Sequence, residues 1–296
     1  MSDTVIQPRP LGHPLAGQSM SGARMIVQVL ADEGVEAIFG YSGGAILPTY
    51  DAVFLHNEEQ TRTAGTQVPL IVPANEQGAG FMAAGYARAT GRVGVCLVTS
   101  GPGATNTVTP IRDCMADSVP IVVICGQVAR ASIGTDAFQE APVAALMGSV
   151  AKHVFLVTDP ARLEATVRSA FELARTGRPG PVVIDVPKDV QNWEGVFQGS
   201  GTLPLPGYRR RMKELADRLL ETREAERFFE MLAQARRPLI YAGGGVINAN
   251  AAGALTEFAT AFDIPVVTTL MGIGAIDTTH RLAMRMLGMH GAAFAN

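Results

Sequence analysis

Residues 93–127 read VGVCLVTSGPGATNTVTPIRDCMADSVPIVVICGQ, and this stretch decides the fold class. Its two ends are almost continuous runs of Val, Ile, Leu and Cys, which predict buried β-strands over 93–100 and 119–127. Residues 101–118 between them predict a glycine turn followed by a helix. A strand, a helix and a second apolar strand in this order indicate a parallel sheet covered on both faces.

The same alternation continues in both directions along the chain. It predicts further strands over 36–40, 68–74, 153–158 and 181–187, separated by helices over 19–35, 45–54, 76–91 and 160–177. We therefore expect a doubly wound α/β domain over residues 19–190, preceded by a disordered tail, 1–18. Residues 191–213 are rich in Gly and Pro and predict a linker. A second α/β pattern over 214–296 offers only about two strands, so we expect an incomplete domain.

Composition excludes several classes of function. A net charge of -3 provides no electrostatic footprint for nucleic acid. No apolar run reaches the roughly 18 residues of a membrane span, and the N-terminus resembles neither a signal nor a transit peptide. The chain has three cysteines, Cys96, Cys114 and Cys125, and their spacing is not that of metal ligands. So few cysteines are typical of reduced thiols, and we therefore expect a cytoplasmic protein.

One acidic residue stands out in the stretch VPANEQGAGFMAAGYARATG, residues 72–91. Glu76 lies in the first turn of a predicted helix made mostly of small and apolar residues. It could simply complement the helix dipole, with Asn75 as the N-cap. Alternatively, a carboxyl in apolar surroundings suits proton exchange with a bound ligand. The residues alone leave both interpretations open.

Three glycine-rich turns follow predicted strands, at residues 40–45, 100–106 and 242–247. Glycine lets backbone N–H groups approach a ligand closely, and open α/β sheets bind ligands where their strands end. Each turn alone is more often structural, but three of them favour a ligand-binding edge. None matches the nicotinamide fingerprint G-x-G-x-x-G in its required context, so a dehydrogenase is the weakest alternative.

Four segments together carry a family resemblance: FGYSGGAILP (39–48), residues 75–106, DSVPIVVICGQV (117–128) and IGTDAFQEA (133–141). They resemble the N-terminal part of the large catalytic subunit of acetohydroxyacid synthase (acetolactate synthase), a thiamine-diphosphate enzyme. The resemblance extends from about residue 20 to the end of the chain. It implies decarboxylation of pyruvate and transfer of the two-carbon unit to pyruvate or 2-ketobutyrate, in branched-chain amino-acid biosynthesis.

The resemblance also assigns roles to residues of the first domain. Glu76 would hydrogen-bond the ring nitrogen of the cofactor's aminopyrimidine and so promote loss of the proton from the thiazolium carbon. Residues of the GYSGG turn would line the aminopyrimidine: Tyr41, Gly43 and Gly44. Phe138 and Gln139 would face the thiazolium and the substrate, and Lys152 would lie near the substrate entrance.

The second domain resembles the family's FAD-binding domain, where the flavin has no net redox role. The matching positions are Arg178, Gly243, Gly244, Gly245, Thr269, Leu270, Met271, Gly288, Met289, His290 and Gly291. The resemblance implies a homodimer or tetramer with the active site at the subunit interface, and leaves open a small regulatory subunit. No metal ligands are expected in this chain, because the family binds Mg²⁺ and the cofactor's diphosphate in a C-terminal domain whose motif is absent here.

Two residues depart from the family's usual pattern. Ser42 stands where proline is usual, and Asn75 stands where histidine is usual; either change could lower activity. Since the C-terminal domain is missing, we expect a fragment of a longer enzyme or an inactive product. The alternatives are another thiamine-diphosphate 2-ketoacid carboligase or decarboxylase, and a non-catalytic remnant that binds flavin. Glu76 argues against a glyoxylate carboligase, and IGTDAFQE argues against a decarboxylase.

Overall fold

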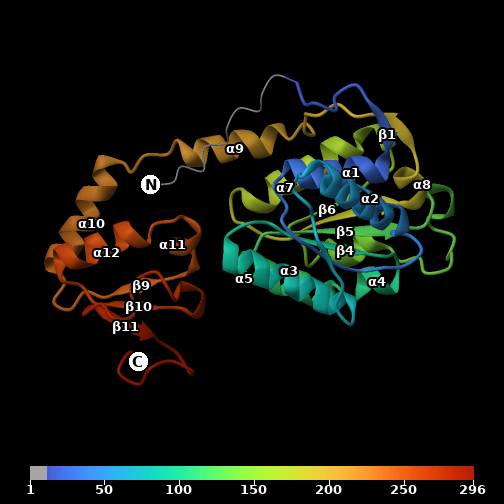
Figure 1. Ribbon diagram of the computed structural model, residues 1–296. Coiled ribbons are helices and arrows are strands. Elements are labelled where there is room, and N and C mark those ends of the chain that lie inside the picture. The colour runs from blue at the N-terminus through green and yellow to red at the C-terminus, as the bar shows by residue number, and fades with distance from the viewer. Residues whose placement is uncertain (1–11) are drawn as a thin grey trace. The chain divides into compact units, whose positions relative to one another are not determined.

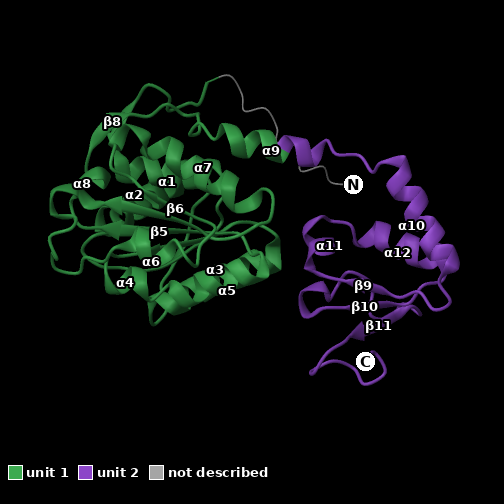
Figure 2. Cartoon of the chain, turned by 180° about the vertical axis from the view of Figure 1, so that it is seen from behind, with its two compact units in different colours: residues 1–212 green, residues 213–296 purple. Residues whose placement is uncertain are grey.

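A computed structural model describes residues 12–296, and residues 1–11 lie outside that description. The chain divides into two compact units, residues 1–212 and residues 213–296, which Figure 2 colours separately. Each unit has its own parallel sheet and its own hydrophobic core. None of the helices in residues 12–296 is long and apolar enough to cross a membrane.

The first unit is built on a six-stranded parallel sheet with the order β3-β2-β4-β5-β7-β6. Figure 1 labels β4, β5 and β6 of this sheet. Its strands are β2 (Ile38–Tyr41), β3 (Leu70–Ile71), β4 (Gly94–Val98), β5 (Ile121–Gln127), β6 (His153–Leu156) and β7 (Val182–Pro187). Every residue of β4, β5 and β7 is buried, as expected for strands that have helices on both faces. The doubly wound α/β fold predicted from the apolar runs is confirmed.

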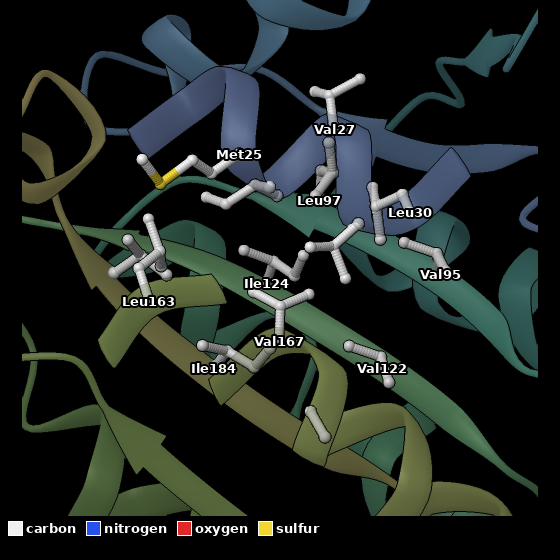
Figure 3. Close-up of a cluster of buried hydrophobic side chains, with 14 of the residues drawn as sticks. Met25, Val27, Leu30, Val95, Leu97, Val122, Ile124, Leu163, Val167 and Ile184 are labelled. Atoms are coloured by element: carbon white, nitrogen blue, oxygen red, sulfur yellow. The ribbon is translucent and has the colours of Figure 1, made fainter. Parts of the chain in front are cut away.

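Helices cover both faces of this sheet. One face carries α1 (Gly22–Asp32), α2 (Leu47–Thr63) and α7 (Leu163–Arg175), and the other carries α3 (Glu76–Thr90), α5 (Val108–Asp117) and α6 (Val143–Met147). Figure 3 shows the first of these cores, in which side chains of α1 and α7 such as Leu30 and Val167 meet Leu97 and Ile124 of the sheet. Two short helices, α4 (Pro102–Thr105) and α8 (Lys188–Gln191), follow β4 and β7.

The ends of the first unit differ from the sequence-based expectation. Residues 12–18 were expected in a disordered tail, yet His13 Nε2 lies 3.0 Å from Asp32 Oδ1 and Gly17 N–H donates to Phe197 O at 2.9 Å. Part of the expected linker forms β8 (Glu194–Val196), which pairs with β1 (Ser19–Ser21), and α9 (Pro206–Ala216) follows. Strands of three residues are too short to show a periodic pattern, so the sequence did not reveal this pairing.

The second unit contains a three-stranded parallel sheet with the order β11-β10-β9. Its elements are α10 (Thr222–Gln234), β9 (Ile240–Ala242), α11 (Gly244–Asn248), α12 (Ala252–Phe262), β10 (Val266–Thr268) and β11 (Ala283–Met286). The sequence indicated about two strands here. The third strand, β11, was not predicted. It is irregular, because Arg285 has a left-handed φ of 62° and the pairing of β11 with β10 shifts register.

Candidate functional site

The first unit has a topological switch point between β2 and β4. The chain passes from β2 to β3 on one side and then returns to β4 on the other side of β2. Open α/β sheets bind ligands at the carboxyl ends of their strands at such a point. Tyr41, the last residue of β2, is paired with Val98, the last residue of β4, so the glycine turns after these two strands are neighbours.

Thr99, directly after β4, joins these two turns. Its Oγ1 accepts a hydrogen bond of 3.2 Å from the N–H of Ala45. A Cβ atom placed on Gly43 would lie 2.5 Å from Thr99 Cγ2, and one placed on Gly103 would lie 2.7 Å from the same atom. Both distances are too short for real side chains, so glycine is required on each side of Thr99 for the turns to approach.

Glu76, at the first position of α3, lies beside the turn that follows β4. Its side chain is only 9% exposed, and Asn106 Nδ2 donates to its Oε2 at 2.8 Å. No other hydrogen bond to this carboxylate occurs within residues 12–296, and its second oxygen, Oε1, lies 3.5 Å from a Cβ placed on Gly103. Asn106 therefore orients the carboxyl group while Oε1 has no protein partner in that part of the chain.

The dipole interpretation of this helix start also has structural support. Asn75 is the N-cap of α3, and its Oδ1 accepts from the N–H of Gly78 at 2.8 Å. The two readings of Glu76 are thus compatible, because a helix N-terminus stabilises the carboxylate while burial and Asn106 direct it. Asn75, the position where the resembling family has histidine, here holds the backbone that carries Glu76.

We expect Asn75→Ala to lower the free energy of unfolding by about 0.5–2 kcal/mol, because the first turn of α3 loses its side-chain acceptor. Urea denaturation measures the difference. Asn75→Asp keeps an acceptor at the same place and serves as the control, with a stability close to the original. Equal stabilities of the alanine and aspartate variants would contradict the capping role.

The loop over residues 133–141 reaches the same edge of the sheet. A Cβ placed on Gly101 would lie 2.3 Å from the carbonyl oxygen of Gln139, so this loop packs against the turn after β4. Glu140 organises the loop by accepting from the N–H groups of Gly134 and Ala137, the latter at 3.1 Å. These backbone donors, Gly134 foremost, lower the pKa of Glu140. Phe138 is 88% exposed on this loop.

Gln127, the last residue of β5, ties that loop to the sheet. Its Nε2 donates to Ala141 O and to Asp185 Oδ2, both at 3.1 Å, and its Oε1 accepts from the N–H of Val128 at 2.8 Å. Phe138 and Gln139 are consequently brought to the end of the sheet that carries Glu76.

Lys152 lies at the opposite edge of the sheet. Its N–H donates to Pro181 O at 2.8 Å, directly before β6 and β7 begin, whereas Glu76 follows the end of β3. Its ammonium donates to the carbonyls of Leu173 and Thr176, the latter at 2.7 Å, and burial lowers its pKa to about 8. Within one chain the structure therefore does not bring Lys152 to Glu76.

Arg178 belongs to the first unit and binds the end of a helix there. Its guanidinium donates to the carbonyls of Met115 and Ala116, at 3.0 and 2.8 Å, and to Ser118 Oγ at 2.8 Å. These groups form the C-terminal end of α5, where a cation complements the helix dipole. These contacts give Arg178 a structural role in the first unit. Its role in binding flavin remains a proposal.

The other predicted flavin positions gather at the strand ends of the second unit. Gly243–Gly245 follow β9, Thr269–Met271 follow β10, and Gly288–Gly291 follow β11. A Cβ placed on Gly272 would lie 2.3 Å from Ala242 O, and one on Gly244 would lie 3.0 Å from Met271 Cβ, so the first two turns touch. His290 and Gly291 line a neighbouring cavity of about 520 Å³.

Residues 12–296 contain no cluster of three or more His, Cys, Asp or Glu side chains that could hold a metal ion. Sequence reasoning did not single out Thr99, Asn106 or Gln127 as site residues. Asn106 could have been identified from the sequence, because it is the last residue of the glycine turn at 100–106, which follows a predicted strand. Thr99 and Gln127 gave a weaker signal, because a polar residue at the end of an apolar strand is common.

Comparison with known proteins now defines the class. Residues 20–147 match the family model "Thiamine pyrophosphate enzyme, N-terminal TPP binding domain", and residues 225–296 match "Thiamine pyrophosphate enzyme, central domain". Together the two models cover well over half of the chain, and both compact units are represented. The chain belongs to the thiamine pyrophosphate (thiamine diphosphate) enzymes.

Within this class the chain is a homologue of acetolactate synthase large subunits. It is 46% identical over 284 residues to the acetolactate synthase large subunit of Corynebacterium glutamicum, and the matched region covers 96% of this chain and 43% of the relative. It is 43% identical over 281 residues to the acetolactate synthase of Mycobacterium bovis, covering 95% and 43%. Against acetolactate synthase 2, chloroplastic, of Nicotiana tabacum, identity is 43% over 275 residues, covering 93% and 39%. The chain thus spans less than half the length of these relatives.

Proposed function

We propose that this chain forms the aminopyrimidine-binding side of a thiamine-diphosphate site in an acetohydroxyacid synthase. The reaction would decarboxylate pyruvate and transfer the two-carbon unit to a second 2-ketoacid, yielding 2-acetolactate or 2-aceto-2-hydroxybutyrate. The observation that carries the proposal is the buried Glu76 carboxyl, oriented by Asn106 and adjacent to Gly103 in the glycine turn after β4. Identity of 40–46% to acetolactate synthases supports the choice of reaction within the class.

The residues at this edge fit a flat, nitrogen-containing ring. Gly44 has open space where a Cβ would stand, and Tyr41 is 38% exposed beside it, so the turn can lie against a ring face. Glu76 Oε1 can hold or release a proton at a ring nitrogen, while Asn106 prevents the carboxyl from turning away. Thiamine diphosphate, when bound, supplies the carbanion-stabilising centre on which 2-ketoacids are decarboxylated.

Phe138 and Gln139 would meet the substrate side of the site. Their loop is fixed against Gly101 and Gln127, yet both side chains are exposed, which suits residues that exclude water only once a ligand is bound. Gln139 has a left-handed φ of 57°, and this backbone geometry turns the loop at the residue that would face the substrate. Lys152 would act only in an assembly that brings it to another subunit's site.

The remaining cofactors and partners belong to the same proposal. FAD would bind across the strand ends of the second unit, held by the turns that begin at Gly243, Thr269 and Gly288. Mg²⁺ and the cofactor's diphosphate would be held by residues outside this chain. A homodimer or tetramer would complete the site, and the exposed apolar side chains of Phe81 and Met82 on α3, 41% and 44% exposed, support a partner at that helix.

Turnover measurements test this function. The protein that carries this chain is incubated with thiamine diphosphate, Mg²⁺, FAD and pyruvate, with or without 2-ketobutyrate, and products are identified by mass spectrometry. We expect 2-acetolactate, and 2-aceto-2-hydroxybutyrate when 2-ketobutyrate is present. Free acetaldehyde as the only product would indicate a decarboxylase instead. Flavin binding without any binding of thiamine diphosphate would indicate a non-catalytic protein.

A further inference from the structure

Gln191, the last residue of α8, is a fully buried polar side chain that joins three segments of the first unit. Its Nε2 donates to Ala45 O at 2.7 Å and to Val186 O at 3.0 Å. Its Oε1 accepts from Thr49 Oγ1 at 2.9 Å, and Thr49 is also fully buried. The amide thereby links the end of β7, the start of α2 and the turn after β2.

Ala45 is held from two sides by these contacts. Its N–H donates to Thr99 Oγ1 at 3.2 Å, and its carbonyl accepts from Gln191 at 2.7 Å. The space behind the carbonyl is closed as well, because a Cβ placed on Gly126 would lie 2.5 Å from Ala45 O. Both polar groups of the Ala45 backbone are therefore paired with side chains of segments that follow other strands of the same sheet, Thr99 after β4 and Gln191 in α8 after β7.

The turn that Ala45 ends has little internal support, because the one backbone hydrogen bond within residues 41–46 runs from the N–H of Ile46 to Gly43 O at 3.0 Å. Between Tyr41 and Ala45 it contains Gly43 and Gly44, the residue type with the greatest backbone freedom, and no proline. Tyr41, Ser42 and Gly44 are exposed at the sheet edge, so packing of their side chains does little to order the turn. Besides that internal bond, the hydrogen bonds that hold Ala45 at the end of the turn come from Thr99 and Gln191.

We propose that Gln191 is a positioning residue. By holding Ala45 O, it fixes the position of the Tyr41–Ala45 turn, so that the main chain of the turn can lie against a flat aminopyrimidine ring. This inference rests on the proposed function for the identity of the ligand, but the clamp itself does not. An amide is suited to the task, since it can donate two hydrogen bonds and accept another from within the core. A carboxylate at the same place would face the carbonyls of Ala45 and Val186.

The test compares Gln191→Met with a matched control. Methionine keeps the size of the side chain and removes the hydrogen bonds, and Thr166→Val removes one buried hydroxyl elsewhere in the same core. Hydrogen–deuterium exchange is followed by mass spectrometry in peptides that cover residues 41–46. We expect exchange there to be about tenfold faster in Gln191→Met, which corresponds to about 1.4 kcal/mol and lies within the range that a buried hydrogen bond contributes. The control should leave it unchanged.

Binding of thiamine diphosphate with Mg²⁺ to the same proteins provides the second measurement. We expect the Kd of Gln191→Met to rise about tenfold while that of Thr166→Val stays the same. Thr49→Val, which leaves Gln191 in place and removes only one bond to it, should show a smaller change of the same sign and covers the case that Gln191→Met does not fold.

The outcomes separate this inference from the proposed function. Unchanged exchange over residues 41–46 in the Gln191 and Thr49 variants would overturn the inference, whatever the protein binds. Faster exchange with an unaltered Kd would overturn the positioning role toward the ligand. If the original protein binds no thiamine diphosphate, the proposed function fails, and the exchange rates alone then support or overturn the clamp on Ala45.

Discussion

Replacement of Glu76 with glutamine is expected to slow hydrogen–deuterium exchange at the thiazolium carbon of bound thiamine diphosphate by about 10²–10⁴-fold, the usual contribution of a positioned acid–base group. Glutamine fills the same space at the start of α3 and can still accept the hydrogen bond from Asn106, so the local geometry should survive. The amide cannot, however, give or take the proton that the carboxyl group shares with a ring nitrogen. Nuclear magnetic resonance of the quenched cofactor measures the exchange.

A matched control for this prediction is Glu194→Gln, in an exposed position of β8. It removes the same charge without touching the sheet edge, and the exchange rate should not change. Flavin affinity should stay the same in both variants, because the predicted flavin turns belong to the second unit. A near-normal exchange rate in Glu76→Gln would falsify the proposed role of the carboxyl group.

Replacement of Asp185 with asparagine is expected to change how the free energy of unfolding depends on pH. Asp185 lies within the apolar strand β7 and is 2% exposed. Gln127 Nε2 donates to its Oδ2 at 3.1 Å, while its Oδ1 has no hydrogen-bond partner within residues 12–296. Burial raises the pKa of Asp185 from 3.8 to about 7, opposed by the hydrogen bond from Gln127.

A carboxyl group whose pKa is higher in the folded state favours folding while it is protonated. Its contribution is therefore fully present below pH 3.8 and is lost as the pH rises to about 7. A pKa shift of this size corresponds to about 4 kcal/mol, because one pKa unit is about 1.4 kcal/mol. We expect the free energy of unfolding of the original protein, relative to Asp185→Asn, to fall by about this amount between pH 4 and pH 8.

Urea denaturation of both proteins at several pH values between 4 and 8 measures this difference. The control is Asp51→Asn on the exposed face of α2, which removes a surface carboxylate and should follow the original protein closely. Parallel curves for the original protein and Asp185→Asn would show that Asp185 does not change its charge in this range. The result also matters for the site, since Asp185 shares Gln127 with the loop that carries Phe138.

Several features of the site could be predicted from the sequence. The apolar runs around residues 93–127 predicted the parallel sheet, and the glycine turns at 40–45, 100–106 and 242–247 favoured a ligand-binding edge where strands end. The turns at 40–45 and 100–106 do follow neighbouring strands of the first sheet, whereas the turn at 242–247 belongs to the second unit. The position of Glu76 at a helix start followed from Asn75 and the strand before it. Each of these inferences depends on residues close together in the chain, where local geometry controls the outcome.

Other features depended on the tertiary structure alone. Asn106 is 30 residues from Glu76, and Gln191 is 146 residues from Ala45, yet each pair is joined by a hydrogen bond of 2.7–2.8 Å. Lys152 directly precedes β6 and so lies at the amino-terminal ends of the strands. The family resemblance had nevertheless assigned it to the substrate entrance. No local pattern indicates such pairings or separations.

The sequence by itself thus determined the strands and helices of the six-stranded sheet, the doubly wound class and the helix start that carries Glu76, because hydrophobic periodicity and capping act over a few residues. The tertiary structure decided which polar side chains meet at the edge of the sheet. Crossover connections in a parallel sheet bring distant segments together, and only the packed register of β2, β4, β5 and β7 sets the partners of Glu76, Ala45 and Asp185.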